Sequence, residues 1–503
     1  MFKTAPSLWT QMAADKSAIM DKTERYAALT IPKICYPDGV VEKDHDNSHD
    51  YQSIGAQCVN HLTNKLMLAM FAPSRANFRI ELGEKTRSKL AAMGQQALSD
   101  AMRALAEQER KAGRVVDSSG QRPKLYASCR HLIIAGNVLL HLEKEIRVMG
   151  LRYFCVKRNA KGKVIRLIIK ERVKFDELDL TVQGYLGVMR YQPEREVDFY
   201  KVLELKGGDM CLTQWVEANQ LPKQFNGKWP EEECPYKVLT WDLSDEADYA
   251  TGLVEEYIGD LEALSVLAEA TVDGAVLGAE QRYMVDPAGV TSVDDLKNSK
   301  NGDAIAGRPE DIDTLEGANY NAVKMASEIG DKYEKRLGRG FLLGSAVTRD
   351  AERVTAEEVR LTAMELESSF GGVYSNLAVT MQRPLARWAL GETGIKVRGL
   401  DLEIIILTGL DALSRGADIE NLRLALTDLG NCAALPEPLL GRIKWRELSD
   451  FIGAGRQVDL TRFLLTDDEY AAQQEAAQQS QVAADAAVAG ASAGARASVQ
   501  GAQ

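Results

Sequence analysis

The sequence lacks the features that would place the chain in a membrane or outside the cell. No apolar run approaches the roughly 18–20 residues that a membrane-spanning helix needs, since the best one, Leu132–Leu142, is shorter and contains Asn137. The opening residues, MFKTAPSLWTQ, have no apolar core of a secretory signal. The seven cysteines include no CxxC pair, which favours buried thiols in a reducing compartment over disulfides. We therefore expect neither secretion nor membrane residence.

An excess of basic charge is also missing. The chain has 61 Lys and Arg against 73 Asp and Glu, a formal net charge of -12. A protein that grips nucleic acid by its phosphates normally carries basic excess, because each neutralised phosphate releases counterions. The balance argues against a tight, sequence-independent DNA binder. It leaves room for a protein that touches DNA without holding it.

Catalytic motifs are nearly absent as well. There is no GxxxxGK[ST] loop, no HExxH and no GxGxxG after a strand. Gly490–Gly494 (GASAG) matches a nucleophile elbow, but no strand precedes it and no histidine follows it, so it is an accident of composition. We expect no catalytic residues and no cofactor, although an enzyme with an unrecognised site stays an alternative.

One loop gathers metal-ligand residue types. Asp44–Asp50 (DHDNSHD) holds two histidines and three carboxylates, which could bind a divalent ion if the loop curled round it. The spacing of an EF-hand is missing, because no glycine stands at the sixth position and no glutamate closes a twelve-residue loop. A solvated polar loop is the favoured interpretation, and no metal site is predicted.

What the chain does contain is an ordinary globular composition, 45% hydrophobic over 503 residues. At roughly 100–200 residues per domain, that length suggests about three units or one large irregular domain. Apolar periodicity predicts early helices and a later antiparallel β region, and so an α+β, predominantly helical fold. The predicted helices are Ser7–Leu29, Tyr51–Phe71, Lys85–Arg114 and Leu125–Ala135, and the predicted strands are Arg75–Leu82, Leu139–Glu143, Arg152–Lys157, Val164–Lys170, Gly187–Tyr191, Val197–Leu205 and Leu400–Thr408.

Two later helices carry opposite charge. The helix Thr251–Gln281 has seven acidic residues and no Lys or Arg: Glu255, Glu256, Asp260, Glu262, Glu269, Asp273 and Glu280. In the helix Tyr320–Leu343, five basic residues outnumber three acids: Lys324, Lys332, Lys335, Arg336 and Arg339. A one-sign face on so long a helix repels itself unless something offsets it, although such a run is usually a solvated face. Between them, Met284–Ala318 is rich in Asp, Gly, Asn and Pro and is predicted to be a compact, loop-dominated excursion.

A polar loop, Gly344–Glu352, precedes the next helix. Thr355 and Glu358 form a capping box that opens it. If that helix continued to about Leu390, interrupted by Gly371-Gly372 and Pro384, it would be roughly 50 Å long. A helix of that length with one apolar stripe usually packs on a large partner surface, such as another subunit. The end, Ala471–Gln503, is almost all Ala, Gln, Ser, Gly and Val and cannot build a core alone, although it could order in an oligomer.

Eight short segments stand out along the chain: YQSIGA (51–56), LTNKLMLAMF (62–71), AGNVLL (135–140), EEYIGDL (255–261), GRPEDI (307–312), SAV (345–347), ERVTAEE (352–358) and GGVYS (371–375). In this order they resemble segments of the portal protein, or head-to-tail connector, of short-tailed bacteriophages of the autographivirus type. The resemblance covers about residues 20–465, and a non-portal ring-forming scaffold or adaptor is the alternative.

The resemblance implies a dodecameric ring at one capsid vertex, which DNA crosses during packaging and ejection. It implies a wing at 1–250, a first stem helix at 251–283 and a clip at 284–318. A second stem helix at 319–343, a channel loop at 344–355 and a long wing helix at 356–391 would follow. The crown would occupy 392–470, ahead of the low-complexity tail at 471–503.

The family plan also assigns roles to residues. An acidic stem (Glu255, Glu256, Asp260, Glu262, Glu269, Asp273) would repel phosphate and let a duplex slide, and Lys332, Lys335, Arg336 and Arg339 would pair with it between subunits. Thr348, Arg349 and Arg353 would line or gate the channel. Arg353 has an equally weighted alternative as a helix residue paired with Glu357. The clip would include Arg308, Pro309, Glu310 and Asp311.

The implied partners are components of a virion. They are double-stranded DNA held without sequence specificity, the terminase large subunit at the clip, and then adaptor and tail tube proteins. Scaffolding, internal core and major capsid proteins would meet the ring elsewhere, and the ring would nucleate procapsid assembly. The chain would reside at the portal vertex of the virion, and in the host cytoplasm during assembly.

Overall fold

A computed structural model describes most of the first 406 residues. The described ranges are 4–37, 51–71, 78–93, 95–118, 120–187, 192–279, 282–315, 320–343, 356–370, 372–394 and 401–406, with the single residues 424, 427, 428, 430 and 448. The chain divides into two units, Met1–Leu410 and Asp411–Gln503. Every helix and strand named below lies in the first.

The predicted mixed, mainly helical class is confirmed. The helices are α1 (Ala5–Ala28), α2 (Ile54–Met70), α3 (Glu84–Met93), α4 (Gln95–Ser118), α5 (Arg122–Ala135), α6 (Leu180–Leu186), α7 (Leu253–Ala279), α8 (Val293–Asn298), α9 (Tyr320–Gly340), α10 (Ala356–Phe370), α11 (Val373–Leu377) and α12 (Arg383–Glu392). The strands are β1 (Phe78–Leu82), β2 (Asn137–Leu142), β3 (Ile146–Met149), β4 (Phe154–Arg158), β5 (Val164–Lys174), β6 (Glu196–Lys206), β7 (Asp209–Val216), β8 (Asn219–Gln220), β9 (Gly227–Pro230), β10 (Tyr236–Thr240), β11 (Arg282–Val285), β12 (Ile312–Leu315) and β13 (Leu402–Ile406).

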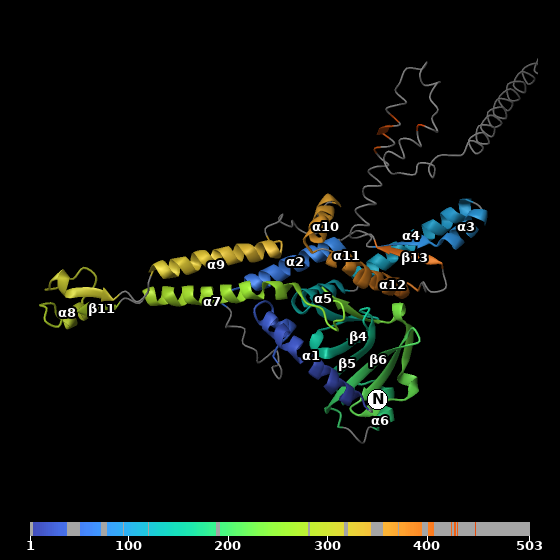
Figure 1. Ribbon diagram of the computed structural model, residues 1–503, viewed down its shortest axis with the longest axis horizontal. Coiled ribbons are helices and arrows are strands. Elements are labelled where there is room, and N and C mark those ends of the chain that lie inside the picture. The colour runs from blue at the N-terminus through green and yellow to red at the C-terminus, as the bar shows by residue number, and fades with distance from the viewer. Residues whose placement is uncertain are drawn as a thin grey trace, which may run out of the picture. The chain divides into compact units, whose positions relative to one another are not determined.

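The middle of the chain forms two antiparallel sheets. One has the order β4-β5-β6-β7-β8, with β9 also on β7, and the other has the order β10-β2-β3. Helix α1 lies along one face of the larger sheet, where Leu8 and Met12 pack with Ile168 and Tyr200 (Figure 1). The opposite face contributes Leu167, among others, to a second cluster. The two faces of the sheet are therefore buried against different elements.

A buried lysine ties α1 to this sheet. Lys16 is 3% exposed, and its Nζ donates to the carbonyl oxygens of Leu151 at 2.7 Å and Phe154 at 2.9 Å. Burial lowers the pKa of Lys16, because a charged amine loses hydration inside the protein. The two carbonyl acceptors offset part of that loss.

The largest core joins the N-terminal helices to α10–α12. Leu62 and Leu66 of α2, Leu132 of α5 and Met381 are all at most 1% exposed. At the end of α5, Gly136 has a φ of +69° and caps the helix in the left-handed conformation, which glycine adopts without steric cost. That turn directs the chain from α5 into β2.

The expected continuous helix over 356–391 is wrong. Helix α10 ends at Phe370, Gly372 has a φ of +95°, and α11, a π-helical segment (Ala378–Gln382) and α12 follow. A left-handed residue cannot continue a right-handed helix, so the chain turns there. Pro384 lies in the first turn of α12, where proline is tolerated.

These last helices also pack against other parts of the same chain. Leu366 and Leu377 are 0% exposed in the main core. The hydroxyl of Tyr374 donates to the carbonyl of Ala69 at 3.3 Å, and Gln382 Nε2 donates to the carbonyl of Met70 at 2.6 Å. Leu366 and Leu377, which belong to the apolar stripe predicted to face another subunit, are therefore buried within the chain, against α2 and its neighbours.

Candidate functional site

The two oppositely charged helices form an antiparallel pair, α7 against α9 (Figure 1). The rings of Tyr257 and Phe341 lie 5.2 Å apart near one end. Towards the other end, a Cβ on Gly274 would lie 2.5 Å from Val323 Cγ2. Such a contact is too short for a real side chain, so glycine at 274 lets the two helices approach closely. The predicted excursion Met284–Ala318 connects the two helices.

Half of the predicted acidic residues are neutralised within the subunit. Lys22 of α1 binds Glu255 at 2.9 Å, and Arg25 of α1 binds Glu262. Arg336 of α9 binds Asp260 with two nitrogens. The carboxylate contacts raise the pKa of Lys22, Arg25 and Arg336. Sequence reasoning missed Lys22 and Arg25, because nothing local shows that α1 lies beside α7.

The remaining acidic residues of α7 are exposed. They are Glu256, Glu269 and Asp273. The negative charge of Glu269 is the first cause of a raised pKa at exposed Tyr51. The uncompensated negative charge therefore extends along α7 to its distal half.

The exposed surface of α7 is also apolar. Val266 is 63% exposed and Val276 57%, with Val272 and Leu277 at 48% each. At about 100° of rotation per residue, these side chains lie about 80–160° around the helix from Leu264, which faces Gly330 of α9. Large exposed apolar side chains that cluster on one helix face are typical of an interaction surface.

Helix α9 presents the opposite charge on its outer side. Lys332, Lys335 and Arg339 are exposed, and their helical positions place them away from buried Leu337. Arg336 lies at the edge of this face, with its guanidinium 4.7 Å from the Tyr333 ring centroid. Of the four basic residues predicted to pair between subunits, Arg336 already binds an acid of its own chain.

The segment predicted as the clip is a small folded element. Strands β11 and β12 pair antiparallel, and Pro309–Asp311 form one turn of 3-10 helix before β12. Asp311 Oδ2 accepts the backbone N–H of Val290 at 3.0 Å and of Thr291 at 3.1 Å. Asp311 thus holds the segment together, a structural role that sequence reasoning missed, while Arg308 and Glu310 are exposed.

The β11–β12 segment exposes several large apolar side chains. Tyr283 and Met284 on β11 are 55% and 58% exposed, and Val290 and Val293 are 67% and 58% exposed. Side chains of this kind beside exposed Arg308 and Glu310 form a mixed surface suited to protein contacts.

The predicted channel residues Thr348, Arg349 and Arg353 lie outside the described residues, as does the predicted capping box. Helix α10, which follows this segment, is held to α2 by an ion pair. On α2, Lys65, whose side chain is 3% exposed, binds Glu365 of α10 at 2.8 Å. Burial, followed by the charge of Lys65, lowers the pKa of His61 one turn earlier on the same helix.

The residues that the structure describes contain no group of three or more His, Cys, Asp or Glu side chains placed to hold a metal ion. Both Asp44–Asp50 and Gly490–Gly494 lie outside those residues. Among the described helices, none combines the length and apolar character needed to cross a membrane.

Comparison with known proteins identifies the family. The family described as "Bacteriophage head to tail connecting protein" matches residues 2–454. The chain is 32% identical to the portal protein of Escherichia phage T7 over 95% of this chain and 90% of that protein. It is 32% identical to that of Pseudomonas phage phiKMV over 97% and 96%, and 30% identical to that of Enterobacteria phage SP6 over 95% and 92%.

Among solved structures, the chain is similar to one described as "Neck of empty GTA particle computed with C6 symmetry", with a TM-score of 0.38 and 11% identity over 77% of this chain and 88% of that chain. The match to the portal proteins extends over nearly the whole sequence, and it confirms the resemblance seen in the residues. The chain belongs to the bacteriophage head-to-tail connecting proteins, the portal proteins.

Proposed function

We propose that this chain forms a dodecameric ring at one capsid vertex and provides the channel for DNA during packaging and ejection. The observation that carries this proposal is the match to portal proteins across at least 94% of the chain. As a member of that family it is a component of the virion. Assembly in the host cytoplasm, with the ring nucleating the procapsid, is part of the proposal.

The exposed acids of α7 support passage of DNA without tight binding. Glu269 and Asp273 lie about 40° apart around α7, and if they face the channel they repel phosphates. Glu256 lies more than about 90° from both. A basic lining would instead trap the duplex through counterion release. Because three other acids of α7 are neutralised by α1 and α9, the repulsion is carried by Glu269 and Asp273 and not by all six predicted residues.

Opposite charge on the two sides of the hairpin supports a head-to-tail contact between neighbouring copies. The contact would use one edge of α7, where Val266 and Leu277 lie about 20° apart beside Asp273. It would also use the outer face of α9, which carries Lys332, Lys335 and Arg339. A contact between two different faces repeats from copy to copy and closes into a ring if the rotation permits. Each exposed ion pair contributes only about 0.2–1 kcal/mol, so burial of Val266 and Leu277 supplies much of the stabilisation.

Charge reversal tests this contact. Lys332→Glu, Lys335→Glu and Arg339→Glu together should convert rings into smaller species in mass photometry and negative-stain images. The matched control reverses three exposed basic residues on another helix, Lys85, Arg87 and Lys89 of α3, and should leave rings intact. Unchanged rings in the first variant would show that neighbouring copies do not associate through α7 of one copy and α9 of the next. A wild-type chain that stays monomeric at high concentration would count against the ring itself.

The segment between α9 and α10 is proposed to narrow the channel. Arg349 and Arg353, with Thr348, would touch the phosphate backbone without reading bases. Arg353→Ala should leave ring assembly unchanged and lower DNA retention in packaged particles. If Glu357→Gln lowers retention equally, the effect belongs to an i,i+4 pair at the helix start and not to contact with DNA.

The clip is the proposed docking platform. Its exposed residues, which include Arg308, Glu310 and Tyr283, would bind the terminase large subunit during packaging and adaptor and tail tube proteins afterwards. Scaffolding, internal core and major capsid proteins would contact other surfaces of the ring. Substituting Arg308 and Glu310 together with alanine should weaken terminase binding in a pull-down while rings persist.

A further inference from the structure

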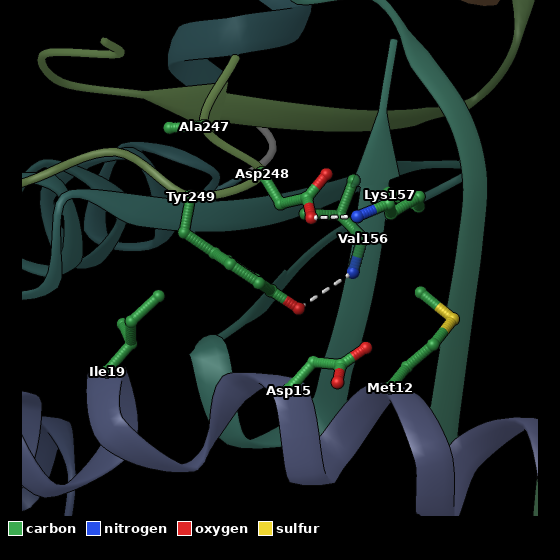
Figure 2. Close-up of a pocket in the computed structure, with 8 residues that line it drawn as sticks. All are labelled: Met12, Asp15, Ile19, Val156, Lys157, Ala247, Asp248 and Tyr249. Atoms are coloured by element: carbon green, nitrogen blue, oxygen red, sulfur yellow. Dashed lines mark hydrogen bonds and ion pairs between the residues drawn. The ribbon is translucent and has the colours of Figure 1, made fainter.

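A small pocket lies between α1, strand β4 and the loop before α7. Its volume is about 180 Å³. Helix α1 contributes Met12, Asp15 and Ile19, strand β4 contributes Val156-Lys157, and the loop before α7 contributes Ala247–Tyr249 (Figure 2). Pockets for drug-sized molecules are roughly 300–1,000 Å³. This one has room for a single long side chain.

The polar groups at this pocket are unequally engaged. Both carboxylate oxygens of Asp248 are occupied, by Lys157 Nζ and by the backbone N–H of Arg158, each at 2.7 Å. The Tyr249 hydroxyl accepts the N–H of Val156 at 3.0 Å and also interacts with the Cys155 side chain. Asp15 is exposed, and among the described residues it forms no ion pair. Figure 2 shows its carboxylate and the Tyr249 hydroxyl pointing into the same space.

The local charge is negative. Asp245 and Glu246, which are exposed, precede Asp248 in the same loop, and Lys157 is the one basic residue among those that line the pocket. Glu246 has a φ of +64°, a conformation that a non-glycine residue adopts at a cost. This turn leads directly into the pocket residues Ala247–Tyr249.

This combination suits one kind of ligand. The side chains of Met12, Ile19 and Val156 supply apolar surface, while Asp15 supplies a carboxylate with free acceptor capacity. Arginine and lysine side chains have the complementary construction, an apolar stem that ends in a cationic donor. A carboxylate and a guanidinium form a short, charge-assisted hydrogen bond, and this pairing favours arginine. DNA is disfavoured because its phosphates would meet acidic side chains.

We propose that this pocket binds an arginine side chain presented by a basic segment of a partner protein other than this chain. The exposed basic face of a neighbouring copy, Lys332, Lys335 and Arg339 on α9, is already assigned to the contact with α7. A basic segment of another protein is attracted by the acidic side chains at the pocket. The pocket is formed by α1, β4 and the loop at 247–249, so this inference does not depend on the assignment of the channel.

The pocket provides its own reporters for a binding experiment. Met12 and Ile19 carry methyl groups that methyl NMR can follow in the assembled protein, with assignments from Met12→Leu and Ile19→Val. The probe is the tripeptide acetyl-Gly-Arg-Gly-amide, titrated to about 10 mM because one side chain binds weakly. Both methyl signals should shift with concentration. The citrulline analogue, which has the same shape without the charge, should leave them unmoved.

Three variants decide the outcome. Asp15→Asn should weaken binding of the arginine peptide about fivefold, the upper range for one exposed ion pair. Asp21→Asn, on the same helix but outside the pocket lining, should bind like wild type. Ala247→Phe, which fills the pocket, should abolish the shifts. Equal shifts with citrulline, no shifts at all, or equal losses in both aspartate variants would overturn the proposal.

Mass photometry separates the two sources of arginine. Asp15→Asn should leave the number of subunits per particle unchanged, since the occupant comes from another protein. A change in that number would show that a neighbouring copy fills the pocket, and would refute the assignment to a different partner.

Discussion

Asn137 fastens the start of α7 to the core, and replacing it gives the sharpest test of this architecture. Its side chain is 0% exposed. Asn137 Nδ2 donates to the carbonyl of Ala250 at 2.7 Å and to that of Ala135 at 3.0 Å, and Asn137 Oδ1 accepts the Ala250 N–H at 2.9 Å. Ala250 stands three residues before α7, so this side chain holds the root of the helix.

Asn137→Ala leaves both backbone groups of Ala250 without their side-chain partner in a buried place, since Ala250 is 4% exposed. An unsatisfied buried group costs about 1–3 kcal/mol, so the two together should cost about 3 kcal/mol. That corresponds to a roughly 100-fold larger local opening equilibrium, at 1.4 kcal/mol per factor of ten.

Hydrogen exchange at the Ala250 amide measures this effect directly. Exchange in the peptide that contains Ala250 should accelerate by about two orders of magnitude in Asn137→Ala. The exposed Asn219 provides a matched control, and Asn219→Ala should leave that peptide unchanged. An acceleration below about threefold would refute the reasoning, because Ala250 would then have an alternative partner in the folded state.

Three further outcomes follow from the structure. Gly340→Ala puts a Cβ 2.4 Å from Tyr257 Cζ and should lower the free energy of unfolding by about 1–3 kcal/mol. The control Gly330→Ala meets only an ordinary contact of 3.7 Å and should not lower it. Equal melting temperatures for the two variants would contradict this prediction. Burial lowers the pKa of His141 to about 3, so the unfolded chain binds the proton first as pH falls below 6.5. His141 should therefore contribute a loss of about 2 kcal/mol in the free energy of unfolding between pH 7 and pH 5, and urea titrations should show a profile flatter by that amount for His141→Gln. Asp311→Ala removes the acceptor of the Val290 and Thr291 N–H groups and of the Thr291 hydroxyl. It should lower the local stability of the β11–β12 segment by about 1–2 kcal/mol and expose the segment to limited proteolysis. Unchanged cleavage would argue against the structural role of Asp311.

Local signals in the sequence predicted much of the fold. The helix expected over Tyr51–Phe71 and that of Ile54–Met70 differ by a few residues, because apolar residues four apart specify both the helix and its buried face. The predicted strand Val197–Leu205 lies within β6 for the same kind of reason. The opposite charges of α7 and α9 were also readable, since net charge along a helix needs no knowledge of neighbours.

Local signals failed where backbone conformation depends on a single residue. The glycines at 371–372 were visible, yet periodicity alone allowed a helix to run through them. In the structure Gly372 is left-handed and redirects the chain so that Tyr374 and Gln382 contact the end of α2. Whether the helix continues or turns depends on packing against α2, about 300 residues earlier in the chain. A short stretch of sequence carries no information about that contact.

The sequence by itself determined the family, the helical and β regions, and the presence of an acidic and a basic helix. Only the tertiary structure decided which charges remain available. Lys22 and Glu255 are separated by 233 residues, and Asp15 meets the loop of Asp248 in the same way across the fold. Propensity and periodicity act over a few residues and can be read locally. Ion pairs and pockets arise when distant segments are packed together, so their partners emerge only from the folded chain.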